Sequence, residues 1–284
     1  MDRNATVFIT GAATGIGKAC ALYLDKIGFH VFAGVRKNID GDALKQGASD
    51  RLQTIIIDVI DTSSIQAAVS EVAHVTNNQL FGLINNAGVA FGGPLEILPI
   101  QDIKRLLEVN VMGVLAVTKA FLPLLRQSRG RIINMGSSSG LLALPCLSTY
   151  AASKFALEAI TDSLRVELSP FGITVSIIEA GNVKTPIWEK GVAVTNQIAD
   201  AACPEILRLY KPLIEFSKHI ALNSPKLPAE KVARVVSKVL HARKPKGRYI
   251  IGTDARLFKL VRHVPCLVRD WIILKIIPNY GYKN

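Results

Sequence analysis

The chain has 284 residues, of which 49% are hydrophobic and 20% are charged. This balance supplies enough apolar surface for a sizeable core and excludes a disordered chain. Lys and Arg number 34 against 22 Asp and Glu, which gives a formal net charge of +12. No segment reaches the roughly 18 apolar residues of a membrane span. No secretory signal opens the chain, so we expect Met1 to begin the mature protein.

Four cysteines lie far apart, with no C-x-x-C pair among them: Cys20, Cys146, Cys203 and Cys266. A chain of this length without a signal does not need disulfides for stability. We therefore expect reduced thiols, no metal site and a cytoplasmic protein.

Short runs rich in Val, Ile and Phe alternate along the chain with longer stretches of helical period. This alternation is typical of a doubly wound α/β fold, in which crossover helices connect the strands of one parallel sheet. No repeat or Gly/Ser linker interrupts it, so we expect a single domain over residues 1–284. The seven predicted strands are Thr6–Thr10, His30–Arg36, Gln53–Asp58, Leu80–Asn85, Gly130–Gly136, Ile173–Ile178 and Arg248–Ile251.

The first predicted strand runs into a glycine-rich turn, and a helix is predicted over Lys18–Ile27. Glycines allow a sharp turn and close approach of a pyrophosphate, while the helix N-terminus offers N–H donors and a positive dipole end. Flavin and methyl-donor sites use similar turns, so the turn alone leaves the ligand class open. Its candidate cofactor-binding residues are Gly11, Thr14, Gly15, Ile16 and Gly17.

The end of the second predicted strand bears on the choice of dinucleotide. An acid there would accept hydrogen bonds from a ribose 2′-hydroxyl, but the sequence places Arg36 and Lys37 at this point. A guanidinium suits a 2′-phosphate, so the sequence favours NADP(H) over NAD(H). The alternative is that both cations are solvated loop charges, because Thr14 adds no second basic group.

The third predicted strand ends at Asp58, which could accept a hydrogen bond from an adenine amino group while Val59 packs against the ring. An isolated Asp at this place is otherwise an ordinary turn residue.

Tyr150 and Lys154 lie one helical turn apart, so both side chains project from the same face. A neighbouring ammonium stabilises a phenolate, so we expect Lys154 to lower the pKa of Tyr150 toward the value that a general acid or base needs. Ser137 stands thirteen residues earlier, at the carboxyl end of the fifth predicted strand. A Tyr/Lys pair at this spacing is usually surface when nothing else agrees with it.

Other motifs agree here, in order along the chain. They are Thr10-Gly11-x-x-x-Gly15-Ile16-Gly17, Asn85-Asn86-Ala87-Gly88, Asn110 within Val109–Gly113, Ser137, and Tyr150-x-x-x-Lys154. The chain thereby resembles the short-chain dehydrogenase/reductase family over nearly its whole length. The resemblance implies a Rossmann-type fold with a seven-stranded parallel sheet flanked by helices. It also implies an oxidoreductase that interconverts an alcohol and a carbonyl with a nicotinamide cofactor.

The same resemblance implies the roles of the catalytic residues. Tyr150 would exchange a proton with the substrate oxygen, and Ser137 would position that oxygen. Lys154 would lower the pKa of Tyr150 and hold the nicotinamide ribose, while Asn110 would fix a water that links Lys154 to solvent.

Two turns complete the cofactor site that the resemblance implies. Asn86 would face the cofactor and stabilise the sheet beside Ala87, with Gly88 clearing space, and Val183 and Thr185 would meet the nicotinamide amide. The family usually has Pro-Gly before the second turn. This chain has Ala180 in place of the proline, which leaves the rigidity of the turn in question.

Residues 186–228 form a longer connection, which we expect to cap the substrate, although a structural excursion that covers the sheet edge is the alternative. Within the family the chain looks most like the branch of retinol and hydroxysteroid dehydrogenases, which implies a lipophilic alcohol or ketone such as a retinoid or steroid. Apolar residues of the cap suit such a substrate: Trp188, Leu207, Tyr210 and Phe216. A homodimer or homotetramer is implied by resemblance.

Residues 256–277 interleave apolar side chains with Arg and Lys, and residues 241–284 carry ten Lys and Arg against two Asp and Glu. This basic amphipathic segment could lie in a bilayer interface, which would make the protein peripherally membrane-associated. It could equally be a final helix packed on the cap or on a neighbouring subunit. The sequence shows no aromatic-and-basic stacking surface and no known nucleic-acid-binding module, so we expect no binding to nucleic acid.

Two rival functions share parts of this pattern. A dinucleotide-sensing regulator would bind NADP(H) without turnover, but it would not need the Ser/Tyr/Lys set. A sugar-nucleotide epimerase or dehydratase would use the Tyr and Lys, but such chains usually carry a larger C-terminal substrate region than this length allows.

Overall fold

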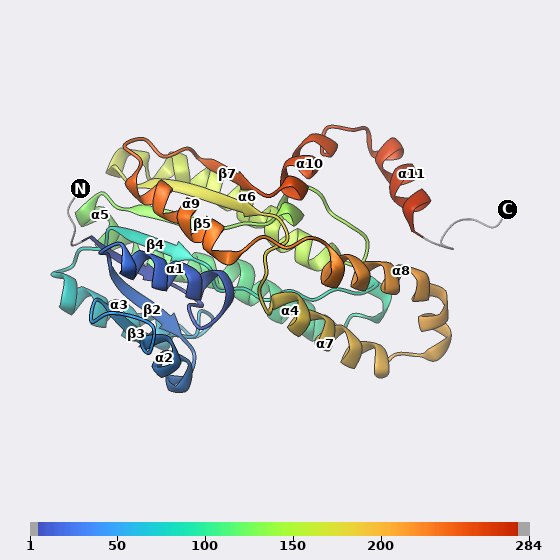
Figure 1. The fold of residues 1–284 in the computed structure, drawn as a ribbon, viewed down its shortest axis with the longest axis horizontal. Helices are drawn as coiled ribbons and strands as arrows, with labels where there is room; N and C mark the ends of the chain where they lie inside the picture. Colours follow the sequence, from blue (N-terminus) through green and yellow to red (C-terminus); the bar gives the residue numbers. More distant parts are fainter. Residues whose placement is uncertain (1–4, 278–284) are drawn as a thin grey trace.

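The computed structural model describes residues 5–277. Its centre is one sheet of seven parallel strands in the order β3-β2-β1-β4-β5-β6-β7, which confirms the predicted doubly wound fold (Figure 1). The strands are β1 (Thr6–Ile9), β2 (His30–Val35), β3 (Leu52–Ile56), β4 (Gly82–Asn85), β5 (Arg131–Met135), β6 (Thr174–Ala180) and β7 (Arg248–Ile251).

The strand order reverses at β1, which pairs with β2 on one side and with β4 on the other. Phe8 is in register with Phe32 of β2 and with Leu83 of β4. Connections leave this point in opposite directions, so the loops beyond the carboxyl ends of β1 and β4 diverge and open a crevice. The glycine-rich turn and the Asn85-Asn86-Ala87-Gly88 turn both lie at this crevice.

Helices cover both faces of the sheet, and the alternation of side chains along each strand separates two cores. Val7 and Ile9 pack with helices α1 and α9, whereas Phe8 packs with α3 and α5. The helices are α1 (Gly15–Lys26), α2 (Asn38–Lys45), α3 (Thr62–Thr76), α4 (Ile100–Leu107), α5 (Gly113–Ser128), α6 (Ser148–Glu167), α7 (Ile187–Asp200), α8 (Pro204–Asn223), α9 (Ala229–His241), α10 (Thr253–Val261) and α11 (Cys266–Ile276). The first begins at Gly15, three residues before its predicted start.

Among the described residues, one stretch, Ile100–Ser128, is long and apolar enough to cross a membrane by length and composition, since it contains an 18-residue window with a mean hydropathy of 1.5. The sequence-based statement that no segment qualifies is therefore too strong. In the fold this stretch comprises α4, a π-type turn and α5. Val117 and Phe121 of α5 are fully buried in the core beneath the sheet. Part of its apolar character thus serves the core, and 44% of the window is buried.

The predicted cap segment folds as two helices, α7 and α8, which extend from the carboxyl edge of the sheet (Figure 1). A short parallel pairing of Val183 with Leu227 joins the two ends of this excursion. The cap is thereby fixed at its base to the turn that follows β6.

The basic C-terminal segment is two helices, α10 and α11, and not one. Proline has no backbone N–H and its ring clashes with a preceding helical turn, so Pro265 ends one helix and begins the next. In Figure 1 α10 follows directly on β7 and α11 lies beyond it, at the same end of the molecule as the cap.

Candidate active site

The glycine-rich turn has the backbone that its sequence requires. Gly11 and Gly15 have φ values of +66° and +59°, a region that residues with a Cβ rarely adopt. A Cβ at Gly17 would collide with the carbonyl oxygen of Gly11 and lie 2.5 Å from the Asn86 amide nitrogen. The side chain of Thr14 makes no capping hydrogen bond to α1. The first N–H groups of this helix therefore have no side-chain cap and suit the pyrophosphate of a dinucleotide.

Asn86 connects the two sides of the crevice. Its Nδ2 donates to the carbonyl oxygens of Thr10 and Gly11, each at 3.0 Å. The Thr10 hydroxyl accepts from the backbone N–H groups of Asn86 and Ala87 at 2.9 and 3.0 Å. Ala87 packs closely against Gly11, where a Cβ would lie 2.8 Å from the Ala87 Cα. The turn after β4 thus fixes the glycine-rich turn.

The residues predicted for the adenosine end lie along the same edge of the sheet. Arg36 is exposed directly after β2, beside the exposed Lys37. Asp58 follows β3, and its Oδ1 accepts from the Ile60 N–H at 3.2 Å. Val59 is buried against the start of α5, where a Cβ on Gly113 would lie 2.8 Å from it.

Tyr150 lies at the first turn of α6 and is buried. Its hydroxyl is hydrogen-bonded to the Ser137 side chain, and the edge of its ring meets Trp188 at a centroid distance of 5.4 Å and an angle of 73°. Ser137 stands just after β5 in an extended conformation and also accepts from the Ser139 N–H at 3.1 Å. The structure therefore brings Ser137 and Tyr150 together, with an aromatic wall from the cap.

Lys154 lies one turn further along α6 and is also buried. Its Nζ donates to the carbonyl oxygen of Met135 at 2.9 Å and lies 5.8 Å from the centroid of the Tyr150 ring. Burial lowers the pKa of Lys154 to about 8, and the nearby Glu158 opposes this shift.

The prediction that the pKa of Tyr150 is lowered is wrong for the protein chain alone. Burial raises the pKa of Tyr150, and the hydrogen bond to Ser137 acts in the opposite direction. The reason is geometric, because the Lys154 ammonium is directed at the Met135 carbonyl and not at the phenol. Desolvation of the phenolate therefore dominates.

Asn110 occupies the π-type turn Glu108–Met112 and is buried. Its Oδ1 accepts from the Val89 N–H at 2.8 Å, while its Nδ2 donates to the Val89 carbonyl at 2.8 Å and to the Ser153 hydroxyl at 3.1 Å. Both amide hydrogens are thus used within the protein. A water that links Asn110 to Lys154 would therefore have to bind the side-chain oxygen or a backbone group of Asn110.

The turn after β6 is held by residues that the sequence pattern did not single out. Asp254 of α10 accepts from the Asn182 N–H at 2.7 Å, and its carboxylate occupies the space that a Cβ on Gly181 would need. The Leu227 N–H donates to Asn182 and the Lys184 N–H donates to Leu227, each at 2.8 Å. These contacts supply the order that Ala180 in place of proline had left in question.

Within this turn Val183 is buried and Thr185 packs against the glycine-rich turn. A Cβ on Gly15 would lie 3.1 Å from the Thr185 Cβ. The ends of β1 and β6, far apart in sequence, therefore meet at one place. Together with Asn86 and Lys154 they form a site whose residues fit a nicotinamide dinucleotide.

A buried pair of carboxyl groups lies next to Lys154, another feature that the sequence analysis missed. Glu158 of α6 and Glu179 of β6 lie close enough to influence each other's pKa, and both contact Arg248 of β7. Arg248 Nε lies 2.6 Å from Glu179 Oε1. Burial and the neighbouring Glu158 raise the pKa of Glu179 to about 8. The sequence could have indicated Glu158 as a neighbour of Lys154, because it lies one helical turn later.

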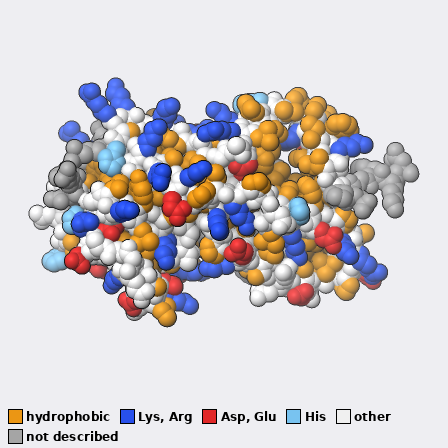
Figure 2. Space-filling model, viewed as in Figure 1, with side chains coloured by type: hydrophobic (Ala, Val, Ile, Leu, Met, Phe, Trp, Pro, Cys, Tyr) orange, Lys and Arg blue, Asp and Glu red, His pale blue; other side chains and the backbone are white. Residues whose placement is uncertain are grey.

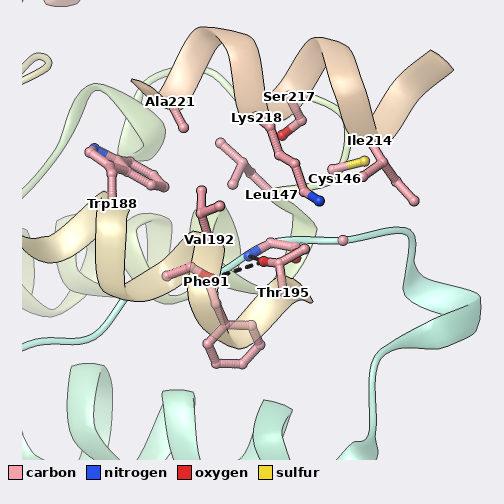
Figure 3. Close-up of a pocket in the computed structure, with 13 residues that line it drawn as sticks. Phe91, Cys146, Leu147, Trp188, Val192, Thr195, Ile214, Ser217, Lys218 and Ala221 are labelled. Atoms are coloured by element: carbon pink, nitrogen blue, oxygen red, sulfur yellow. Dashed lines mark hydrogen bonds between the residues drawn. The ribbon is translucent and has the colours of Figure 1, made fainter. Parts of the chain in front are cut away.

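A recess of about 340 Å³, with the solvent at its mouth included, lies between the loop after β4 and the cap helices (Figure 3). Neither Ser137 nor Tyr150 lines it, but Trp188 both lines it and contacts Tyr150. The Thr195 hydroxyl donates to the Gly92 carbonyl at 2.6 Å, which fixes α7 to this loop. The lining residues are Phe91, Gly92, Gly93, Cys146, Leu147, Trp188, Gly191, Val192, Thr195, Ile214, Ser217, Lys218 and Ala221.

The other predicted cap residues lie beside this recess. Tyr210 and Phe216 pack with Cys146, whereas Leu207 is half-buried on α8 and does not line the recess. The Tyr210 hydroxyl donates to Glu96 at 2.9 Å. Of the predicted apolar set, Trp188 is the residue that reaches the Tyr150 ring.

Comparison with known proteins decides the family. The family model described as short chain dehydrogenase matches residues 5–194, more than half of the chain. The chain is a short-chain dehydrogenase/reductase. Membership in this family makes it an NAD(P)-dependent oxidoreductase, as the motifs implied.

Relatives of this short-chain dehydrogenase/reductase include retinol dehydrogenase 5 of Homo sapiens, 39% identical over 97% of this chain and 90% of the relative. An NADPH-dependent 3-dehydrocapnine reductase of Ornithobacterium rhinotracheale is 34% identical, over 94% of this chain and 95% of the relative. A solved short-chain dehydrogenase from Streptomyces avermitilis has a TM-score of 0.75 at 26% identity, covering 96% of this chain and 97% of that one. The expected likeness to retinol dehydrogenases is confirmed.

Proposed function

We propose that this short-chain dehydrogenase/reductase interconverts a bulky lipophilic alcohol and its carbonyl, with a preference for NADP(H). The observation that carries the proposal is the buried Tyr150 hydroxyl, which is hydrogen-bonded to Ser137 and walled by Trp188. A phenol in this setting can exchange a proton with a substrate oxygen while water is excluded from the reacting atoms.

Each proton-handling residue has a role that its surroundings support. Tyr150 donates a proton to a carbonyl oxygen or takes one from an alcohol, and Ser137 holds that oxygen by a hydrogen bond. Burial lowers the pKa of Lys154 to about 8, so its protonation state can change close to neutral pH. Asn110 braces this arrangement through Val89 and Ser153.

The residues assigned to the cofactor fit a nicotinamide dinucleotide. The α1 N-terminus with Gly11, Gly15 and Gly17 would take the pyrophosphate, and Asp58 and Val59 the adenine. Lys154, Val183 and Thr185 would hold the nicotinamide riboside. When bound, the nicotinamide ring supplies or accepts the hydride.

The preference for a lipophilic substrate is supported by the recess and by the relatives. Aromatic and aliphatic side chains dominate the lining, and Trp188 connects the recess to Tyr150. Apolar linings with few polar groups are typical of sites for lipophilic ligands. Relatives that bear the name retinol dehydrogenase support a substrate of retinoid or steroid size.

Replacement of Tyr150 by Phe tests the chemistry. We expect kcat to fall about 10²- to 10⁴-fold, the usual contribution of a general acid/base, while NADPH still binds with similar affinity. Tyr23→Phe, a change on α1 outside the site, serves as the control and keeps its activity. Full activity of the Tyr150→Phe enzyme on any accepted retinoid or steroid would disprove this assignment. Absence of turnover by the wild-type protein across such a panel would favour a sensing role.

Replacement of Arg36 by Asp tests the cofactor preference. The added carboxylate repels a 2′-phosphate and accepts from a free 2′-hydroxyl. The ratio of kcat/KM for NADPH over that for NADH should fall at least about tenfold, since one good charged contact is worth 1.5–3 kcal/mol. Lys45→Asp, at an exposed position on α2, is the charge-matched control. An unchanged ratio in Arg36→Asp would exclude a 2′-phosphate contact.

We also propose that the enzyme is a homodimer or homotetramer. Exposed apolar side chains on neighbouring helices support this, among them Met112 before α5, Leu115 on α5 and Phe155 on α6. Light scattering of the wild-type protein and of Phe155→Glu measures it. A contact through these helices should give a smaller mass for the variant, and a monomeric wild-type protein would exclude one.

A further inference from the structure

We propose that the C-terminal hairpin, defined here as α10, α11 and their connection (residues 253–277), docks the protein onto an anionic phospholipid bilayer. The proposal concerns a surface away from the reacting atoms and does not depend on the identity of the substrate. One side of α11 packs on the cap helix α8 through Leu213, as one sequence-based alternative expected, and the proposal concerns the opposite, exposed side.

The outer side of α11 is apolar and exposed. Leu267, Trp271 and Leu274 recur at the i, i+4 and i+7 spacing of one helix face, with 80%, 61% and 43% of their surfaces exposed. Val268 and Ile272 extend the same face. Exposed apolar residues scattered singly are ordinary, but a contiguous set that includes a Trp marks an interaction surface.

The inner side of α11 fixes the direction of this face. Ile273 and Ile277 pack on a small core with Cys146 and Leu213, so the helix is attached to the body of the protein through that side. The apolar face therefore points outward because the opposite side is already used. Figure 2 shows hydrophobic side chains gathered over α10 and α11, with Lys and Arg among them.

Helix α10 adds cations and further exposed apolar groups to the hairpin. Leu257 and Leu260 are exposed, and a shallow groove beside them is lined by Arg248, Arg256 and Lys259. Arg248 is bound to the buried carboxyl pair, so Arg256 and Lys259 are the cations of this groove that remain for a ligand. A lipid phosphate matches their charge.

The charge of the whole hairpin favours an anionic surface. Residues 253–277 contain five Lys and Arg and two Asp. One of these acids, Asp254, is turned inward to the Asn182 N–H, and the other, Asp270, lies 3.7 Å from Arg269. The outward side therefore combines apolar groups with unbalanced positive charge, the pattern of helices that lie in a membrane interface.

Geometry limits how the hairpin can bind. Its helices have nine and eleven residues, well below the roughly 20 needed to span a bilayer. They can lie in the interface, with the apolar groups below the phosphates and the cations level with them. A second copy of the chain fits less well, because a symmetric contact would place cations against cations.

Flotation of the full chain with vesicles tests the proposal. Two vesicle types are compared, phosphatidylcholine alone and phosphatidylcholine with phosphatidylserine. We expect the wild-type protein to bind the anionic vesicles at least about tenfold more strongly, since each basic residue near such a surface contributes about 1 kcal/mol. Leu267→Glu/Trp271→Glu should reduce binding to the anionic vesicles by more than about tenfold, because both side chains leave water on docking.

Two further variants separate the contributions. Arg256→Glu/Lys259→Glu should remove most of the preference for the anionic vesicles and leave the weak binding to neutral ones. Ile39→Glu, at an exposed position of similar character on α2, is the matched control and should float like the wild-type protein. Circular dichroism and NADPH titration verify that each variant is folded.

Three results would overturn the proposal. The first is a wild-type protein that floats with neither vesicle. The second is a Leu267→Glu/Trp271→Glu protein that floats as well as the wild type. The third is a smaller mass of that variant in light scattering without any vesicle binding by the wild type, which would assign the face to contact between copies of the chain.

Discussion

Arg248→Met removes the one cation that lies between two buried carboxyl groups. Its Nε lies 2.6 Å from Glu179, its Nη2 is bonded to Glu158, and Asp162 lies 3.7 Å away. Glu179 is fully buried and Glu158 nearly so. Methionine retains much of the arginine stem and can pack in its place. The substitution therefore isolates the loss of charge.

The size of the effect depends on pH, because the carboxyl groups can take up protons. Breaking a buried ion pair costs about 3–5 kcal/mol when the remaining charge stays ionised. The pKa of Glu179 is about 8 in the folded protein against an ordinary value of 4.5. Below 4.5 both states bind the proton. Between the two values the folded state binds more protons, so stability falls as pH rises through this window.

Loss of Arg248 removes the group that lowers both carboxyl pKa values, so this fall becomes steeper. At about pH 8.5 we expect Arg248→Met to reduce the free energy of unfolding by about 3–5 kcal/mol. At about pH 5.5 both carboxyl groups can be neutral, and the loss should shrink to about 1–2 kcal/mol.

Urea unfolding followed by circular dichroism at both pH values measures these differences. Arg165→Met is the control, because Arg165 forms an exposed pair with Asp162 that contributes at most about 1 kcal/mol. The reasoning fails if the two substitutions cost the same. It also fails if the cost of Arg248→Met does not grow between the lower and the higher pH.

Three further substitutions test the site. Gly17→Ala forces a Cβ against the Gly11 carbonyl, so NADPH titration should show affinity at least about tenfold weaker and stability lower by about 1–3 kcal/mol. Gly47→Ala, whose Cβ would meet Leu22 at an ordinary 3.8 Å, should change neither. Asp254→Ala removes the acceptor of the Asn182 N–H in the turn after β6 and should therefore raise the KM for NADPH several-fold. An unchanged KM would exclude a positioning role for Asp254. Trp188→Ala admits water to Tyr150, so the basic limb of the pH profile of kcat/KM should move to lower pH; an unmoved limb would contradict burial as the cause of the raised pKa.

The parts of this structure that sequence predicted are those encoded by local patterns. The central strand β1 has a continuous apolar run because helices cover both faces of the sheet. The Gly15-Ile16-Gly17 turn was predictable because its glycines indicate the backbone conformation that the turn needs. The pairing of Tyr150 with Ser137 could be expected because Ser137 lies at the carboxyl end of a strand and Tyr150 follows it at the family spacing.

The parts that sequence did not predict depend on contacts between distant segments. Asp254 reaches a turn 72 residues away, and nothing in its local pattern marks it. Glu179 lies in an apolar strand, and its polar neighbours, Glu158 and Arg248, come from α6 and β7. The direction of the Tyr150 shift depended on where the Lys154 ammonium points, which spacing cannot give.

The close fit of Asp254 against Gly181 couples two positions that belong to different elements. Any side chain at position 181 would displace the carboxylate, so a change there is tolerable only when residue 254 shrinks or withdraws. Directed evolution of this enzyme should therefore recover substitutions at the two positions as pairs, and a screen that varies them one at a time would miss that route.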